Sequence, residues 1–130
     1  GSEMCIRDRL EKLSKTYEAE IQGMATEYQN KLKQYQAEVD TKTEEENTKR
    51  AQEVQTMEQS IRQYQGQAQQ DLQKKESELL KPIFDKAKAA IQKVAKAQGF
   101  QYVLDSTQGS GVLLADGKDL MADVKKELGF

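Results

Sequence analysis

The chain has 130 residues, of which 20 are basic and 22 acidic, so its formal net charge is -2. Charged residues make up 32% of it and the hydrophobic set only 36%, which is too polar for a compact core along the whole length. One proline and eight glycines argue against a disordered or loop-rich chain. We therefore expect elongated helices with a narrow apolar seam, together with one small packed module.

Composition also argues against several function classes. No run approaches the roughly 18 apolar residues of a membrane span, so we expect no stable membrane insertion. The chain has one cysteine and no histidine, which leaves no disulfide framework and removes the commonest general base and metal ligand. The near-neutral charge gives no electrostatic footprint for nucleic acid. We expect no catalytic residues, no metal and no cofactor, and hence no enzyme.

Residues 1–9 look foreign to the rest of the sequence. Gly1 and Ser2 are typical of a tag-cleavage remnant, and the segment has neither the apolar run nor the cleavage site of a signal peptide. We interpret residues 1–9 as a non-native leader, in which Cys5 is an incidental free thiol. Localisation therefore has to be inferred from other features of the chain.

A regular apolar pattern starts at Leu10. Its steps of 3, 4 and 4 residues give an 11-residue period, which stays nearly in phase with a straight α-helix. The intervening positions are mostly good helix formers. The pattern predicts an amphipathic helix from about residue 10 to residue 42. Its apolar positions are Leu10, Leu13, Tyr17, Ile21, Met24, Tyr28, Leu32, Tyr35 and Val39.

The pattern lapses over residues 40–50 and then resumes. The second set is Val54, Met57, Ile61, Ala68, Leu72, Leu79 and Ile83. Folding the chain back near Glu45–Asn47 sets Val39 opposite Val54, and the same register sets Tyr35 opposite Met57. We predict an antiparallel coiled-coil hairpin over residues 10–80. The alternative is one continuous helix, because no glycine or proline marks a turn.

The apolar pattern of the sequence changes at Pro82. Proline removes an intrahelical hydrogen bond and clashes with the preceding turn, so we expect a kink or a new helix start there. The apolar stripe then widens, which indicates a helix packed on a real core. Gly99 supplies the usual left-handed stop for this helix.

Residues after Gly99 have strand character. Phe100–Asp105 and Val112–Ala115 are rich in aromatic and apolar residues and are separated by turn residues, which predicts a β-hairpin. Asp119 can cap a last helix, Leu120–Leu128, closed by Gly129. Residues 81–129 therefore form a predicted α+β head. Since two strands alone are marginally stable in water, the head should need further strands, from an N-terminal segment or other subunits.

These residues resemble the Skp/OmpH family of periplasmic outer-membrane protein chaperones. The resemblance covers roughly residues 10–129, and its C-terminal half is the more specific part because the proline break, strand pair and last helix occur in family order. The runs that carry it are Gln73–Ile83, Ala89–Ile91, Val94–Ala95, Gly99–Asp105, Leu114–Asp116, Asp119–Leu120 and Asp123–Gly129.

The resemblance implies a homotrimer, in which β-rich heads join the subunits and three helical tentacles surround a cavity. Such proteins are ATP-independent holdases of the periplasm that bind unfolded outer-membrane β-barrel proteins and prevent their aggregation. Family members begin with an extended segment that enters the head, whereas residues 1–9 carry no alternating apolar pattern. This departure puts trimer formation in question.

Charge is the second departure from the family. Well-known members are strongly basic, but residues 10–80 carry 10 basic and 14 acidic side chains, and residues 81–130 carry 8 basic and 6 acidic. The family's binding of lipopolysaccharide therefore has no support in the charge of this chain, and no residues are assigned to it.

Two groups of residues are candidates for binding. Methionine and tyrosine suit promiscuous contact with a client, although packing between the two arms competes with this interpretation for all except Tyr64, which is expected beside the seam. The client-contact candidates are Tyr64, Met24, Met57, Tyr28 and Tyr35. The expected contacts of the head with other subunits are Phe100, Tyr102, Leu104, Val112 and Leu114.

A second function from another class stays open. A structural or adaptor coiled-coil protein would bind one folded partner through its helical face and would ignore unfolded chains. A hydrolase or metal enzyme is the third class, and it lacks any nucleophile–base pair or ligand cluster.

Overall fold

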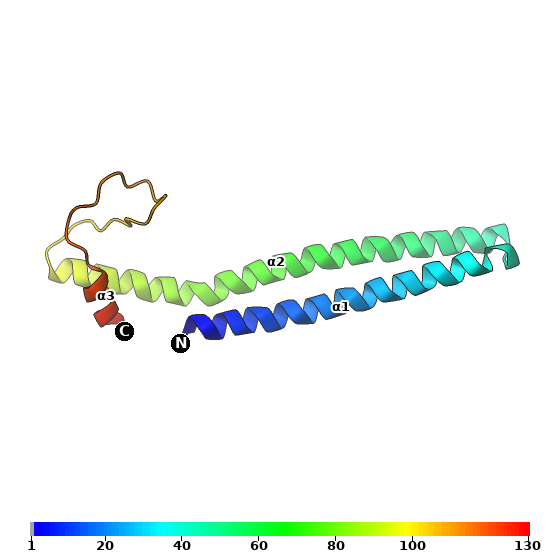
Figure 1. Ribbon diagram of the computed structural model, residues 1–130, viewed down its shortest axis with the longest axis horizontal. Coiled ribbons are helices and arrows are strands. Elements are labelled where there is room, and N and C mark those ends of the chain that lie inside the picture. Colours follow the sequence, from blue (N-terminus) through cyan, green and yellow to red (C-terminus); the bar gives the residue numbers. More distant parts are fainter. Residues whose placement is uncertain (1) are drawn as a thin grey trace. The chain divides into compact units, whose positions relative to one another are not determined.

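The computed structural model describes the backbone of residues 2–130 and the side chains of residues 5–130. Its elements are α1 (Ser2–Glu38), a short 3-10 helix η1 (Val39–Thr41), α2 (Glu44–Ala97) and α3 (Met121–Leu128), as Figure 1 shows. The chain divides into two compact units, one ending at Glu78 and the other running from Leu79 to Phe130. We call them the hairpin unit and the C-terminal unit.

The hairpin unit is an antiparallel pair made of α1 and the first part of α2, which lie side by side in Figure 1. The predicted hairpin is confirmed, and the alternative of one continuous helix is wrong. The predicted seam positions between Leu10 and Tyr35 are all half-buried, whereas Val39 remains 47% exposed. Ala68, at 4% exposure, is the one fully buried residue among residues 5–78, so each arm packs along a single stripe.

The turn of the hairpin comes earlier than the sequence pattern indicated. Residues 42–43 separate η1 from α2, whereas the predicted turn at Glu45–Asn47 lies in the first turn of α2. A capping box fixes this start: the Thr43 N–H donates to Glu46 Oε2 at 2.9 Å, and the Glu46 N–H donates to Thr43 Oγ1 at 3.1 Å. The side chain of Asn47 also donates to the Val39 carbonyl at 2.9 Å.

The register of the two arms is shifted as a consequence. Tyr35 was expected opposite Met57, but its hydroxyl donates a hydrogen bond to Glu53 at 2.5 Å. Glu53 lies four residues before Met57, which is about one turn of α2. The predicted register was therefore wrong, because it was derived from the apolar periodicity alone and every 11-residue repeat aligns with another at several offsets.

Helix α1 also differs from the prediction at both ends. It begins at Ser2 rather than near Leu10, and it gives way to η1 after Glu38 rather than continuing to residue 42. Residues 5–9 thus extend the first arm as helix, and their side chains are exposed apart from that of Ile6. Their assignment as a non-native leader stays an expectation.

The C-terminal unit has a small core between α3 and the end of α2. Ala90 and Val94 of α2 pack against Leu120 and Val124, and none of the four is more than 9% exposed. Polar contacts surround the core. Lys93 pairs with Glu127 at 2.5 Å, Gln98 donates to Asp123 at 2.8 Å, and Lys118 donates to Gln98 at 2.5 Å.

Pro82 does not start a new helix. Helix α2 continues through it, because the fixed φ of proline is compatible with a helix even though its nitrogen cannot donate a hydrogen bond. The carbonyl that loses this donor belongs to Glu78, four residues earlier. The division between the two compact units directly follows Glu78, so the break that the sequence indicated marks the boundary of a unit.

The predicted C-terminal ends of the two helices in this unit are confirmed. Gly99 has a φ of 77°, and the Phe100 N–H donates to the Ala95 carbonyl at 2.9 Å, which is the bond of a Schellman motif. Gly129 ends α3 in the same way, with a φ of 86°. Helix α3 begins at Met121, one residue later than predicted, and its N-cap position is Leu120, which makes no side-chain cap. Asp119, just before it, accepts a hydrogen bond from the Met121 N–H at 2.9 Å.

The predicted β-hairpin of the head is wrong for this chain on its own. Residues 98–120, which we call the connecting segment, contain no strand among the described residues. The predicted turn is present, because the Thr107 N–H donates to Asp105 at 2.9 Å and the Ser110 N–H donates to the Thr107 carbonyl at 3.0 Å. Phe100–Asp105 and Val112–Ala115 form no ladder, since two strands without further partners gain little in water.

Candidate functional site

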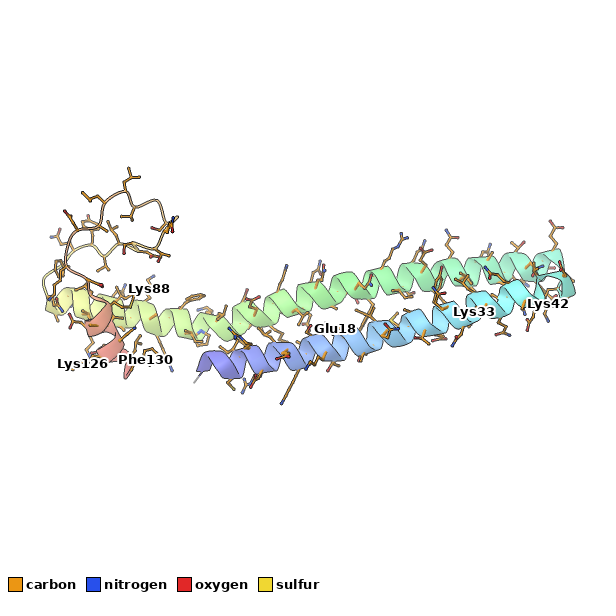
Figure 2. All side chains as sticks on the ribbon, viewed as in Figure 1. Glu18, Lys33, Lys42, Lys88, Lys126 and Phe130 are labelled. Atoms are coloured by element: carbon orange, nitrogen blue, oxygen red, sulfur yellow. The ribbon has the colours of Figure 1, made fainter. Side chains whose placement is uncertain are left out.

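Most client-contact candidates lie in the seam between the arms. Met24, Tyr28 and Met57 are half-buried, and the side chains on the outer faces of the two helices are charged or polar. Figure 2 labels two of these exposed charged residues, Glu18 and Lys33, together with the exposed Lys42 of the turn. The geometry therefore favours packing between the arms for these methionines and tyrosines, with part of each side chain accessible to solvent.

Tyr64 is the candidate that the sequence placed beside the seam, and the structure packs its ring against a seam residue of the other arm. Its ring meets the ring of Tyr17 edge to face, with centroids 5.9 Å apart and an interplanar angle of 66°. Tyr64 is half-buried like the other seam residues. It shares a face of α2 with Ile61 and Ala68, because steps of 3 and 4 residues separate them, and Gln65 at the predicted seam position is exposed.

A polar cluster joins the arms next to the turn. Arg50 Nη2 donates to Glu38 at 2.7 Å, and the Arg50 guanidinium lies 4.4 Å from the centre of the Tyr35 ring. Glu53 accepts hydrogen bonds from both Tyr35 and Lys31. We call these five residues, Lys31, Tyr35, Glu38, Arg50 and Glu53, the turn clamp.

Contacts within the turn clamp shift the pKa values of four of its members. Hydrogen bonds from Lys31 and then Tyr35 lower the pKa of Glu53, and the hydrogen bond from Arg50 lowers the pKa of Glu38. The same carboxylate of Glu53 raises the pKa of the Tyr35 hydroxyl and of the Lys31 ammonium. The clamp is thus held together by charges that depend on ionised carboxylates.

Arg50 is the member of the clamp that is least accessible to solvent. Its side chain is 19% exposed, and its Nη1 is buried without a hydrogen-bond partner among the described residues. Leaving a donor unpaired costs free energy, and the contact with the Tyr35 ring offsets part of that cost. Tyr35, a client-contact candidate, therefore also contacts a half-buried charge.

The other four members of the clamp were not among the binding residues predicted from the sequence. Their signal was the spacing of charged residues beside the seam, with Lys31 and Glu38 flanking Tyr35 on one arm and Arg50 and Glu53 on the other. The Thr43–Glu46 capping box gives the start of α2, and with it the register that brings these residues together.

The connecting segment exposes large apolar side chains. Tyr102 is 84% exposed, Leu104 is 70% and Leu114 is 75%, while Phe100 is less exposed and Val112 is half-buried. These are the five residues expected to contact other subunits. Their backbone forms no ladder within the chain, so both apolar area and hydrogen-bonding groups are available to a partner.

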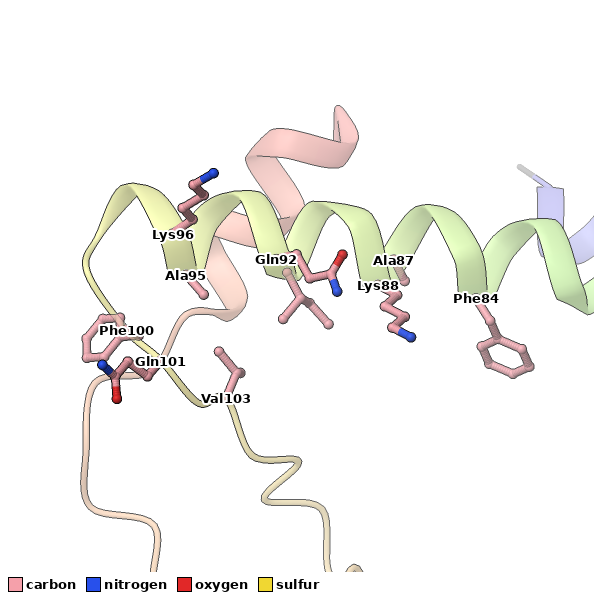
Figure 3. Close-up of a pocket in the computed structure, with 10 residues that line it drawn as sticks. Phe84, Ala87, Lys88, Gln92, Ala95, Lys96, Phe100, Gln101 and Val103 are labelled. Atoms are coloured by element: carbon pink, nitrogen blue, oxygen red, sulfur yellow. The ribbon is translucent and has the colours of Figure 1, made fainter.

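A shallow groove lies beside the base of this segment. It encloses about 520 Å³ and is lined by apolar residues of α2, including Ile91 and Ala95, and by Phe100 and Val103 of the connecting segment. Lys88 and Lys96 also line it, and Figure 3 shows Lys88 on the same side of α2 as Phe84 and the Lys96 ammonium pointing away from the groove. The groove has an apolar floor and a cationic edge, which suits binding of a polypeptide better than chemistry on a small substrate.

The described residues contain no group of three or more His, Cys, Asp or Glu side chains suited to hold a metal ion. No helix within residues 2–130 is both long enough and apolar enough to span a bilayer. The connecting segment therefore offers exposed apolar side chains and backbone without ladder partners as the candidate site.

Comparison with known proteins gives one family. A family model described as Outer membrane protein (OmpH-like) matches residues 5–128. The match begins at Cys5, inside the segment interpreted as a foreign leader, and it includes both arms of the hairpin, the connecting segment and α3. No curated protein matches the chain.

Proposed function

The chain belongs to the OmpH-like family of outer membrane proteins, and from this premise we propose that it is an ATP-independent holdase chaperone of the periplasm. It binds unfolded outer-membrane β-barrel proteins in a cavity between helical tentacles and prevents their aggregation. The family match over residues 5–128 is the observation that carries the proposal, because it covers the hairpin and the C-terminal unit together.

The hairpin unit suits the tentacle of such a chaperone. Its arms pack along one stripe in which Ala68 is the single buried residue among residues 5–78. Local separation of the arms therefore costs less free energy than opening of a globular core. Partly accessible tyrosine and methionine side chains, among them Met24 and Tyr28, supply weak and adaptable contacts. Many weak contacts hold an unfolded client without selecting one sequence.

The C-terminal unit suits the head of a homotrimer. Its connecting segment exposes the apolar side chains of Tyr102, Leu104 and Leu114, and such exposed apolar area is typical of an interface with another protein. The backbone around these residues lacks ladder partners. Strand pairing between subunits would bury the apolar side chains and would give the backbone its hydrogen-bond partners. The β-structure that the single chain does not form would then arise on assembly, since several strands stabilise one another where two do not.

Aggregation of a client tests the holdase directly. An outer-membrane β-barrel protein unfolded in urea is diluted into buffer with and without the full chain, and turbidity is followed. We expect turbidity to fall with increasing chain and to vanish at one trimer per client without added ATP, because binding only the unfolded state removes it from aggregation. Unchanged turbidity at a large excess of chain would refute the holdase.

The same experiment separates the alternative function. An adaptor that binds one folded partner leaves the turbidity of unfolded clients unchanged and binds a native partner saturably. A refolded sample of the same β-barrel in detergent serves as the control. We expect no binding to it, since its apolar surface is covered and its strands are paired.

Molar mass from light scattering tests the trimer. We expect a mass three times that of the 14.8 kDa chain. The variant Leu114→Asp places a charge in the exposed apolar part of the connecting segment and should shift the mass toward that of the single chain. Gln108→Asp, which adds the same charge at an exposed polar position, should leave the trimer intact. A trimer that survives Leu114→Asp unchanged would argue against this interface.

A further inference from the structure

The cross-arm polar contacts of the hairpin unit gather at its turn. The turn clamp supplies four of them, namely Arg50 with Glu38, Arg50 with Tyr35, and Glu53 with both Lys31 and Tyr35. Farther from the turn, the contact between Tyr17 and Asp71 is the next polar one across the arms among the described residues. The seam between the clamp and the Tyr17–Asp71 contact is apolar. The clamp joins the arms next to the turn, where the apolar stripe is weakest.

The apolar stripe is weakest at the turn because it ends there. Val39 is 47% exposed, and residues 40–50 contribute no large apolar side chain to the seam. Burial therefore contributes little to closure at this end, and the free energy of closure depends on the ionic and aromatic contacts of the clamp. A change in the charge of the clamp should act on this end first.

Glu53 is the residue on which the contacts converge. From α1 it faces Lys31 and Tyr35, and from its own helix it faces the charge of Arg50. Glu38, the other carboxylate of the clamp, faces Arg50, Lys42 and the side-chain amide of Gln34. Ionised Glu53 accepts from two donors of the opposite arm, so a single carboxylate joins the helices twice.

We propose that the turn clamp is an acid-sensitive closure of the hairpin, in which protonation of Glu53 releases Lys31 and Tyr35 and lets the arms separate at the turn. A protonated carboxyl group carries no charge for the Lys31 ammonium and loses acceptor strength toward the Tyr35 hydroxyl. Release of Tyr35 also removes the ring that lies over the half-buried Arg50 guanidinium. The apolar seam below stays paired, so the opening is local.

The direction of the pH dependence follows from the depressed pKa of Glu53. A carboxylate whose pKa is lower in the folded state stabilises closure at pH values above its ordinary value of 4.5. This contribution is lost as the pH falls through the lower folded value. We therefore expect opening below pH 4.5, with Glu38 adding to it in the same direction.

A distance measurement across the turn tests the proposal in the full chain. Nitroxide labels are placed by Lys33→Cys and Gln55→Cys, both at exposed positions near the clamp, in a Cys5→Ser background. Pulsed electron paramagnetic resonance then gives the distance distribution at pH 7 and below pH 4.5. We expect a narrow distribution at pH 7 and a broad, longer one in acid, reversible on neutralisation.

Glu53→Gln isolates the titrating group, because it is neutral at every pH. We expect this variant to be broad already at pH 7 and to lose the acid-dependent shift. Glu58→Gln is the matched control, since Glu58 lies on the same helix and pairs only with Arg62 of that helix, at 2.8 Å. It should behave as the parent does.

Two results would overturn the proposal. One is a narrow distribution at pH 7 in Glu53→Gln, and the other is a full acid response in that variant, which would assign the opening to other carboxylates such as Glu46 of the capping box. Helix content from circular dichroism checks the fold. If Glu53→Gln loses its helices, the distance distribution is measured in Tyr35→Phe instead. A broader distribution than that of the parent at pH 7 supports the clamp, and an identical one refutes it.

Discussion

Tyr17 and Tyr64 meet edge to face across the hairpin, with ring centroids 5.9 Å apart, and the Tyr17 hydroxyl donates a hydrogen bond to Asp71. Aromatic rings with a polar end fill the seam while their hydroxyls reach a carboxylate beside it. Tyr35 and Glu53 repeat this arrangement near the turn. The hairpin is thus held by half-buried rings whose hydroxyls are bonded to carboxylates of the opposite arm.

Tyr64→Ala should destabilise the hairpin by about 1–2 kcal/mol, because it removes the ring contact with Tyr17 and half-buried apolar area. Urea unfolding followed by circular dichroism measures the change. Tyr64→Phe is the control and should unfold like the parent, since it keeps the ring. Equal destabilisation by both substitutions would show that the hydroxyl, rather than the ring contact, matters.

Thr43→Ala should cost about 1 kcal/mol, because it removes the side-chain half of the capping box that starts α2. The urea midpoint of the full chain measures the loss. Thr48→Ala provides the matched control, since the Thr48 hydroxyl bonds only the Glu44 carbonyl within the same helix, at 2.9 Å. It should be neutral or slightly stabilising, because alanine is the better helix former. A Thr43→Ala chain as stable as the Thr48→Ala chain would contradict the cap.

Tyr17 and Tyr35 should ionise late in an alkaline titration followed by ultraviolet absorbance. The carboxylates of Asp71 and Glu53 raise the pKa of Tyr17 and Tyr35 above the ordinary value of 10.0. A raised pKa stabilises the fold below pH 10 and loses that contribution as the pH rises through the higher value. We expect Asp71→Asn to bring one tyrosine back to the ordinary range. A late phase that persists unchanged in this variant would argue against the bond.

Leu120→Ala should destabilise the C-terminal unit by about 2–4 kcal/mol, because Leu120 is 8% exposed and packs in the core between α2 and α3. Faster hydrogen exchange of the α3 amides measures the loss. Leu113→Ala is the matched control: its side chain is fully exposed at 101%, so exchange in α3 should stay the same. Equal effects of the two substitutions would place the core elsewhere.

The helices and their ends in the C-terminal unit follow from local chemistry. Gly99 and Gly129 adopt the left-handed conformation that only glycine adopts without strain, and Asp119 accepts a hydrogen bond from the first N–H of α3. These features depend on residues within a few positions of one another. Sequence patterns predict them for that reason, and the 11-residue apolar period predicts the two arms of the hairpin in the same way.

Long-range features were predicted less well. The position of the turn and the register of the arms depend on which polar groups meet across the seam, as in the pairs Tyr35–Glu53 and Glu38–Arg50. Apolar periodicity leaves several offsets nearly equal in buried area. The polar contacts choose among them, and these contacts become visible only when both helices are in place.

The low apolar fraction determined from the start that this chain would be long helices with one small core, because too few apolar side chains exist to cover a globular interior. The tertiary structure decided where the remaining apolar area lies. Tyr102 and Leu114 stay in water, and the segment that bears them forms no strand. Strand formation requires a neighbouring strand as well as suitable residues, so sequence alone predicted strands that the isolated chain does not form.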